Sequence, residues 1–423
     1  MKHHPWGPGM GIEQDWDGRL QLEPWQLPEG LSHLPSREFL THEGLPETAA
    51  FLDFSGLDAT GLEPFADGGG TGEHLFVLGG TAYLADLARE DDAVVLDGVT
   101  GEVFLAAHRS GALRRDLLAT GLSALVGLMR EVDVAALAAE ERDAVAGERG
   151  PAIVAEVARV ARERLRATDP ELFAHYDAAP PHWETALLVR SLAWGALPGD
   201  PDGLAYELGG ELVEDLAALT EDGAVRRFRP EELPDGLTHG PTRRLLTVVG
   251  LPTGGPMLDI AADGPLVTMV EAYPDYFAPV PVPDEGHIPD EGPVPDDDAW
   301  ERDHQRHHLA LAAWPYDLAI ALDGATGRLE LPAWDDPGLP AAYLNRDVSA
   351  LLYTLWTCER IRAEWRLWEY GVAKDRWEVF DPQSLLSGVV EGVLTALDPA
   401  AFAGPDHSWQ LLADDHHMGG LLY

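Results

Sequence analysis

Short apolar runs and long amphipathic stretches succeed one another twice along this chain, in the same order. Apolar runs that are followed by a glycine-containing turn and a second apolar run predict two β-hairpins. Their strands are expected at 93–96 with 103–105 and at 318–322 with 329–331. Apolar residues spaced three and four apart predict helices at 122–132, 153–165, 348–364 and 385–397. Strands grouped between flanking helices indicate an α+β fold with mostly antiparallel sheets.

The order is the same in both halves because blocks of sequence recur. The strongest match joins 27–46 to 233–252, where twelve of twenty positions are identical. Further matches join 96–103 to 322–329, 122–125 to 348–351, and 169–174 to 398–403, and a tryptophan follows the last block in each half. Collinear blocks over this length predict a duplicated domain rather than a solenoid.

Within the first block, proline and glycine bound a short helix in each copy, at 35–43 and at 241–249. Proline is tolerated in the first helical turn, and glycine after the last turn adopts positive φ at little cost. In the hairpins, Asp-Gly-x-Thr-Gly is turn chemistry. The resulting structural motif residues are Pro35, Arg37, Gly44, Pro46, Asp97, Gly98, Gly101, Trp183, His239, Pro241, Arg243, Gly250, Pro252, Asp323, Gly324, Gly327 and Trp409.

Two residue types in this block also have the chemistry to contact a partner. His33 and His239 are expected to cap the following helix or to satisfy a buried backbone group, and partner contact is the alternative. Arg37 and Arg243 are expected at the surface or bridging to a nearby carboxylate.

The repeat predicts two domains, 1–198 and 205–423, joined by a glycine- and proline-rich linker at 199–204. The second domain carries an acidic, proline-rich insertion at 274–300, which we expect to be a disordered or extended loop. Its carboxylates could mimic a phosphate chain and bind a partner's basic cleft, and a solvated loop without a partner is the alternative. The residues concerned are Asp284, Glu285, Asp290, Glu291, Asp296, Asp297 and Asp298.

These blocks resemble the SUKH superfamily and, within it, the SUKH-4 immunity proteins. The resemblance rests on 233–252, 322–327, 344–350 and the closing 398–403 that leads to Trp409, and the first copy carries the same marks more weakly. It implies two tandem SUKH-like domains, each a mostly antiparallel sheet flanked by helices. It also implies a non-enzymatic, cytoplasmic protein that neutralises a toxin, often a nuclease or deaminase, by occlusion. A tandem scaffold that recruits cellular proteins is the alternative.

The charge of the chain limits the kind of partner. Asp and Glu number 73 against 29 Lys and Arg, which gives a formal net charge of −44. Such a field repels nucleic acids and anionic membranes, and it attracts a basic protein partner. Richness in Ala, Gly, Pro, Asp and Arg, with lysine only at Lys2 and Lys374, is typical of actinobacterial coding bias.

Candidate catalytic chemistry is sparse. One cysteine, Cys358, excludes an intrachain disulfide and indicates a reducing cytoplasm, and its apolar helical setting favours a buried packing role. We find no phosphate loop, paired Cys-x-x-Cys or hydrolase motif, and we expect no catalytic residue, cofactor or metal. His304 and His308 have helical metal-ligand spacing, although a polar helix start is the favoured interpretation. The first sixteen residues lack an apolar run, so no signal peptide is expected.

Overall fold

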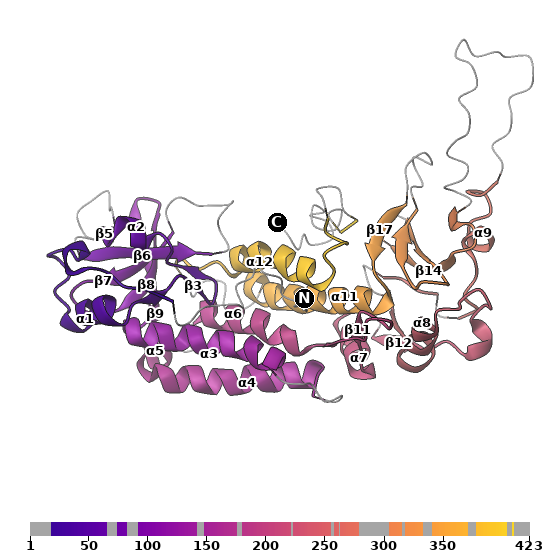
Figure 1. The fold of residues 1–423 in the computed structure, drawn as a ribbon, viewed down its shortest axis with the longest axis horizontal. Helices are drawn as coiled ribbons and strands as arrows, with labels where there is room; N and C mark the ends of the chain where they lie inside the picture. The colour runs from indigo at the N-terminus through magenta and orange to yellow at the C-terminus, as the bar shows by residue number, and fades with distance from the viewer. Residues whose placement is uncertain are drawn as a thin grey trace, which may run out of the picture. The chain divides into compact units, whose positions relative to one another are not determined.

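The computed structural model describes most of the chain (Figure 1). The described residues are 18–65, 74–82, 92–141, 148–175, 180–220, 223–254, 258–261, 263–278, 304–314, 318–332, 341–370, 378–403 and 408–409. The chain divides into two compact units. The first comprises Met1–Gly195 and Ile361–Val393, and the second comprises Ala196–Arg360 and Leu394–Leu421.

The first unit holds an antiparallel sheet with the strand order β3-β4-β6-β7-β8-β9, and β5 pairs with β6. The strands are β3 (Thr48–Ala49), β4 (Leu52–Asp53), β5 (Glu63–Pro64), β6 (Leu75–Thr81), β7 (Ala93–Asp97), β8 (Val103–Arg109) and β9 (Ala112–Ala119). In β7, the consecutive residues Val94, Val95 and Leu96 are all fully buried. Successive strand residues point to opposite faces, so the middle of this sheet is covered on both sides.

Helices pack beside this sheet as the apolar spacing predicts. Helix α3 (Leu122–Glu141) contacts α4 (Pro151–Thr168) and α6 (Pro181–Ser191). Its buried residues Leu125, Leu128, Met129 and Val132 recur at three- and four-residue spacing and form one apolar stripe. Each predicted helix is confirmed, and α3 runs past residue 132 because strong helix formers continue to Glu141.

The first unit also includes the end of α11 (Val348–Tyr370) and most of α12 (Pro382–Leu397). Asp116, buried on β9, accepts hydrogen bonds from the backbone N–H groups of Glu378, Val379 and Phe380 at 3.0, 2.8 and 2.7 Å. One carboxylate thus satisfies three consecutive backbone donors and anchors this late segment of the chain within the first unit.

The second unit holds a four-stranded antiparallel sheet with the order β14-β15-β16-β17. Its strands are β14 (Leu309–Trp314), β15 (Leu318–Leu322), β16 (Leu329–Leu331) and β17 (Ala342–Asn345). Met269 and Phe277 form a buried cluster with Ala319 and Ala321 of β15. Because Phe277 is buried, the first residues of the predicted insertion, 274–278, are packed turns rather than an extended loop. Residues 279–300 lie outside the described part of the chain.

The repeated blocks fold alike, which confirms two tandem copies of an α+β domain. The pairs are η1 (Pro24–Gln26) with η3 (Pro230–Glu232), α1 (Leu34–His42) with α8 (Gly240–Arg244), β7–β8 with β15–β16, and α3 with α11. Gly44 and Gly250 end the short helices with φ of 73° and 92°, as predicted. The copies differ at this point, because the second helix closes with a π-helical turn, η4 (Leu245–Val249).

The other elements are short connections. Residues 197–207, which contain the predicted linker, form a hairpin of β10 (Leu197–Pro198) and β11 (Tyr206–Glu207). Matching ribbons β1–β2 and β12–β13 flank the first block of each copy. The remaining bounds are β1 (Arg19–Leu20), β2 (Leu45–Pro46), β12 (Ala224–Arg226), β13 (Leu251–Thr253), α2 (Leu57–Thr60), α5 (Pro170–His175), η2 (Leu192–Trp194), α7 (Gly210–Leu219) and α9 (Met269–Ala272).

Candidate partner-binding surface

The first block of each copy is fastened to the hairpin of the same copy. The backbone N–H of His33 donates to the Gly98 carbonyl at 2.8 Å, and that of His239 donates to the Gly324 carbonyl at 2.9 Å. Each histidine Nδ1 lies 2.8 Å from a hydroxyl one turn later, on Ser36 or Thr242. The rings therefore contact a side-chain hydroxyl, whereas we expected them to contact a backbone group.

The arginine of the first block also donates hydrogen bonds to backbone carbonyls in each copy. The guanidinium of Arg37 donates to the carbonyls of Pro28 and Leu31 at 3.2 and 3.0 Å. Arg243 makes the corresponding bonds to Pro234 and Leu237 at 3.0 and 3.1 Å. The expected carboxylate partner is replaced by two carbonyls, so in each copy this arginine ties the preceding loop to the short helix.

The hairpin turns contain the aspartates that the sequence singles out. Asp97 accepts from the N–H groups of Val99 and Thr100 at 2.8 and 3.0 Å. Asp323 accepts from the Ala325 N–H at 2.8 Å and the Thr326 hydroxyl at 2.6 Å. These are Asx-turn contacts, so both aspartates shape the turn.

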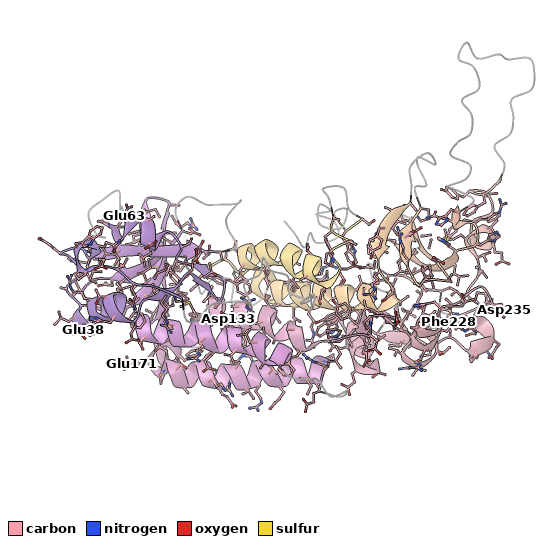
Figure 2. The ribbon with its side chains drawn as sticks, in the orientation of Figure 1. Glu38, Glu63, Asp133, Glu171, Phe228 and Asp235 are labelled. Atoms are coloured by element: carbon pink, nitrogen blue, oxygen red, sulfur yellow. The ribbon has the colours of Figure 1, made fainter. Side chains whose placement is uncertain are left out.

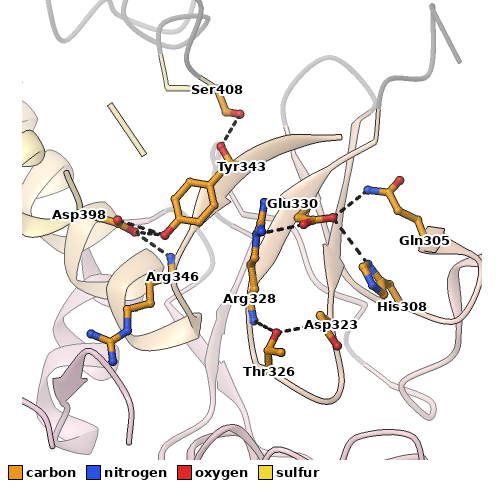
Figure 3. Close-up of polar contacts among 10 residues, drawn as sticks. All are labelled: Gln305, His308, Asp323, Thr326, Arg328, Glu330, Tyr343, Arg346, Asp398 and Ser408. Carbon is orange, nitrogen blue, oxygen red and sulfur yellow. Dashed lines mark hydrogen bonds and ion pairs between the residues drawn. The ribbon is translucent and has the colours of Figure 1, made fainter. Parts of the chain in front are cut away.

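The closing blocks anchor their copies in the same way. The indole N–H groups of Trp183 and Trp409 donate to the carbonyls of Leu118 and Leu344 at 2.9 and 3.3 Å. In the second copy, Asp398 also accepts from the Arg346 N–H at 2.8 Å (Figure 3). The repeated motif residues thus hold each copy together, and most are committed to internal contacts.

Adding a methyl group where the histidine packs on the turn tests this arrangement. A Cβ at Gly101 would lie 2.2 Å from the His33 ring, and one at Gly327 would lie 2.5 Å from the His239 ring. Both glycines have positive φ, 82° and 84°. We therefore expect Gly101→Ala and Gly327→Ala each to lower the free energy of unfolding by about 2 kcal/mol.

Urea titration of the full chain, followed by circular dichroism, measures that loss. The matched controls are Gly111→Ala and Gly264→Ala, because both positions have positive φ, 76° and 100°, and no neighbour lies within 4 Å of an added Cβ. Equal stability of all four variants would show that the histidine contact contributes little.

Among the described residues of the first copy, three large apolar side chains are exposed, and sequence reasoning did not single them out. Trp25 is 81% exposed, Leu34 68% and Val99 52%. Their counterparts in the second copy, on the same backbone elements, are small or charged: Glu231, Gly240 and Ala325. Comparing the positions at which the copies differ, rather than those at which they agree, would have found these residues.

Each of these side chains has an acidic residue within four positions of it along the first copy. Glu23 and Glu38 are exposed and Glu102 is half-exposed (Figure 2 labels Glu38). The second copy has an arginine at each matching position: Arg229, Arg244 and Arg328. We call Trp25, Leu34 and Val99, together with these three glutamates, the apolar–acidic face.

The contacts described above join the segments of the first unit that carry this face. Arg37 ties the segment that carries Trp25 to helix α1. The bond from His33 to Gly98 ties the turn that carries Val99 to the start of that helix, beside Leu34. The face is therefore built on elements that the repeated motif holds in place.

A second notable feature of the first unit is a strained turn held by charged side chains. Ala50 and Phe51 join β3 to β4 with φ of 46° and 65°, a conformation that normally selects Asn-Gly. Asp133 accepts from the Ala50 N–H at 3.2 Å, and His182 Nε2 donates to its carbonyl at 3.2 Å. Arg190 lies 4.4 Å over the Phe51 ring and 3.0 Å from Asp133. We call this group the clamped turn.

Burial governs the protonation of this group. It raises the pKa of Asp133, although the Arg190 guanidinium opposes the rise. It lowers the pKa of His182 to about 4, although the Ala50 carbonyl favours the protonated ring. Because these polar groups are directed at one backbone turn, the arrangement supports structure rather than substrate chemistry.

The second unit has a buried carboxylate of its own, Glu330 on β16 (Figure 3). It accepts from Gln305 Nε2 at 3.2 Å and pairs with Arg328 at 3.0 Å, and His308 Nδ1 lies 3.9 Å away. Burial lowers the pKa of His308, although Glu330 opposes this. The predicted His304 and His308 pair does come together, with ring centroids 4.9 Å apart.

The described residues do not support a metal site or a membrane-spanning helix. There, no three His, Cys, Asp or Glu side chains gather as a metal site would require. Cys358 is buried in α11. Across the same residues, no helix combines the length and apolarity needed to cross a bilayer. The acidic run from Asp284 to Asp298 lies outside the described residues, so its role as a phosphate mimic stays a prediction.

The fold and surface define a duplicated α+β module in which the repeated motif is structural and one copy exposes an apolar–acidic face. The family model of the SUKH-4 immunity protein matches residues 6–188 and 212–415, and the chain belongs to that family. Comparison with curated proteins and with solved structures gave no match.

Proposed function

We propose that this chain is a cytoplasmic immunity protein that binds a basic toxin domain, such as a nuclease or deaminase, and blocks it by occlusion without catalysis. The single observation that carries the proposal is the match of both copies to the SUKH-4 immunity family. The net charge of −44 supports a basic partner. An acidic surface speeds the association of a basic protein and disfavours acidic partners by repulsion.

Growth rescue tests the proposal. The probe is a candidate basic toxin domain, sought first among the genes next to the one for this chain, and expressed from an inducible promoter in a bacterial host with or without the full chain. We expect growth to be restored when both are present. Full toxicity in the presence of soluble chain would contradict the proposal.

The salt dependence of the affinity then tests whether the acidic charge contributes to toxin binding. Titration calorimetry with a catalytically inactive form of that toxin domain should give a Kd that weakens about tenfold or more between 50 and 500 mM salt, since screening acts on exposed charges. A Kd that does not change with salt would show that the acidic charge plays no part in binding.

A further inference from the structure

We infer that the toxin docks on the apolar–acidic face of the first copy and that the second copy does not carry this site. The inference rests on the proposed function and adds to it the location of the site and the chemistry of the partner surface. The partner presents an apolar patch bordered by lysine or arginine.

The two copies act as an internal comparison. They share the backbone elements of the face, yet the first exposes Trp25, Leu34 and Val99 where the second has Glu231, Gly240 and Ala325. Fold stability does not require these apolar side chains, because the second copy folds without them. A single exposed apolar residue is ordinary, but three on segments that are hydrogen-bonded to one another, tryptophan among them, are the kind of anchor that interfaces use.

The negative charge of the glutamates in this face indicates a basic partner surface. Glu23, Glu38 and Glu102 each lie within four residues of one of the apolar side chains, and each replaces an arginine of the second copy. A negative rim around an apolar centre is complementary to a basic rim around an apolar centre. The face therefore fits the same basic partner that the net charge of the whole chain attracts.

A second copy of this chain is a poorer fit to the face. Two such faces would bring acidic rims together, which costs free energy. The arginine-bearing end of the second copy offers no large apolar side chain at the matching positions, and two of its arginines are paired internally. Arg229 lies 2.8 Å from Glu232, and Arg328 lies 3.0 Å from Glu330.

The experiment gives the first copy the residues of the second. The apolar variant of the full chain is Trp25→Glu with Leu34→Gly and Val99→Ala, and the charge variant is Glu38→Arg with Glu102→Arg. The control is Val248→His, which removes an apolar side chain that is 64% exposed in the second copy and installs its first-copy counterpart, His42. Circular dichroism and thermal unfolding verify that each variant is folded.

Binding to the inactive toxin domain is measured by calorimetry and stopped-flow mixing. We expect the apolar variant to weaken the Kd about thirtyfold or more, as loss of a tryptophan hot spot does. The charge variant should slow association about tenfold at low salt, and Val248→His should leave both constants unchanged. If the apolar variant does not fold, Trp25→Glu alone with the charge variant decides the question.

The outcomes separate the two proposals. Tight binding by the apolar variant overturns the location of the site and leaves the immunity function standing. Failure of the natural chain to bind or rescue overturns both. If sedimentation velocity shows that the apolar variant turns a dimer into a monomer while its toxin affinity is unchanged, the face holds a second copy of the chain, and the inference is wrong.

Discussion

Replacing Asp133 by asparagine is expected to lower the free energy of unfolding by about 3–5 kcal/mol, because it removes a carboxylate that pairs with a buried guanidinium. Asp133 and Arg190 have side chains only 5% and 3% exposed, and they lie 3.0 Å apart. Asparagine keeps an oxygen that can accept from the Ala50 N–H, so the loss reports on the charge pair rather than on the turn's hydrogen bond.

Two further variants make this prediction sharper. Arg190→Met should cost less than Asp133→Asn, because burial already raises the pKa of Asp133 and the lone carboxyl can take up a proton. An arginine has no such escape, because the guanidinium does not give up its proton in proteins. The double variant Asp133→Leu, Arg190→Met should cost less than Asp133→Asn, because neither charge then remains buried.

Urea titrations at pH 7 and pH 5 measure all three variants. The Arg190→Met protein should recover part of its stability at pH 5, where the carboxyl protonates more readily, and the double variant should not. If Asp133→Asn and the double variant lose equal stability, the buried charge is not the cause, and the clamp acts through packing alone.

The sequence predicts the parts of this fold that depend on local backbone demands. Gly44 and Gly250 lie where a helix must end, and the prolines that follow them make the same prediction from a different constraint. The hairpins and long helices follow from the spacing of apolar residues alone. Duplication strengthens each of these predictions because the chain supplies two examples.

The contacts between distant segments could not be predicted in that way. The packing of His33 on Gly101 joins a helix start to a turn far along the chain, and only the tertiary fold brings them together. The clamped turn left only a partial trace in the sequence, because Arg190 is a charge within an apolar helical stretch, whereas Asp133 closely follows the charged residues Arg130 and Glu131. A charge in such a stretch indicates a buried partner, but its identity is set by how the helices pack.

The candidate surface was overlooked for a different reason. Comparing the copies drew attention to identical residues, and in this chain identity marks the residues that hold each domain together. Leu34 lies within the most similar block and Trp25 lies two residues before it, and the copies differ at both positions. A duplicated binding module is free to change its surface while its internal contacts persist, so differences at exposed positions carry the information about a partner.

Acid should destabilise the first unit through His182 over the range from pH 6.5 down to about 4. The Ala50 carbonyl can only accept a hydrogen bond, so Nε2 carries the ring proton, and the buried Nδ1 has no hydrogen-bond partner within the described residues. A second proton on the ring would therefore be buried without an acceptor, and burial lowers the pKa of His182 to about 4.

The direction of the pH effect on stability depends on whether the folded or the unfolded chain binds the extra proton. Between these pH values the unfolded chain holds His182 protonated and the folded chain does not, so stability falls as pH falls. The loss from this one residue should approach about 3 kcal/mol at pH 4. The folded-state pKa of Asp133 is raised instead, so its proton is bound more tightly in the folded chain and its contribution has the opposite sign.

The matched variant is His182→Gln, whose amide can donate to the Ala50 carbonyl but does not titrate. Urea titrations of both proteins from pH 7 to pH 4 isolate the histidine, because Asp133 and the surface carboxylates contribute equally to both and cancel in the difference. The two stability curves should converge as pH falls, with the glutamine protein losing about 3 kcal/mol less. Parallel curves would mean that the ring is protonated in the folded protein, and the buried environment assigned to it would be wrong.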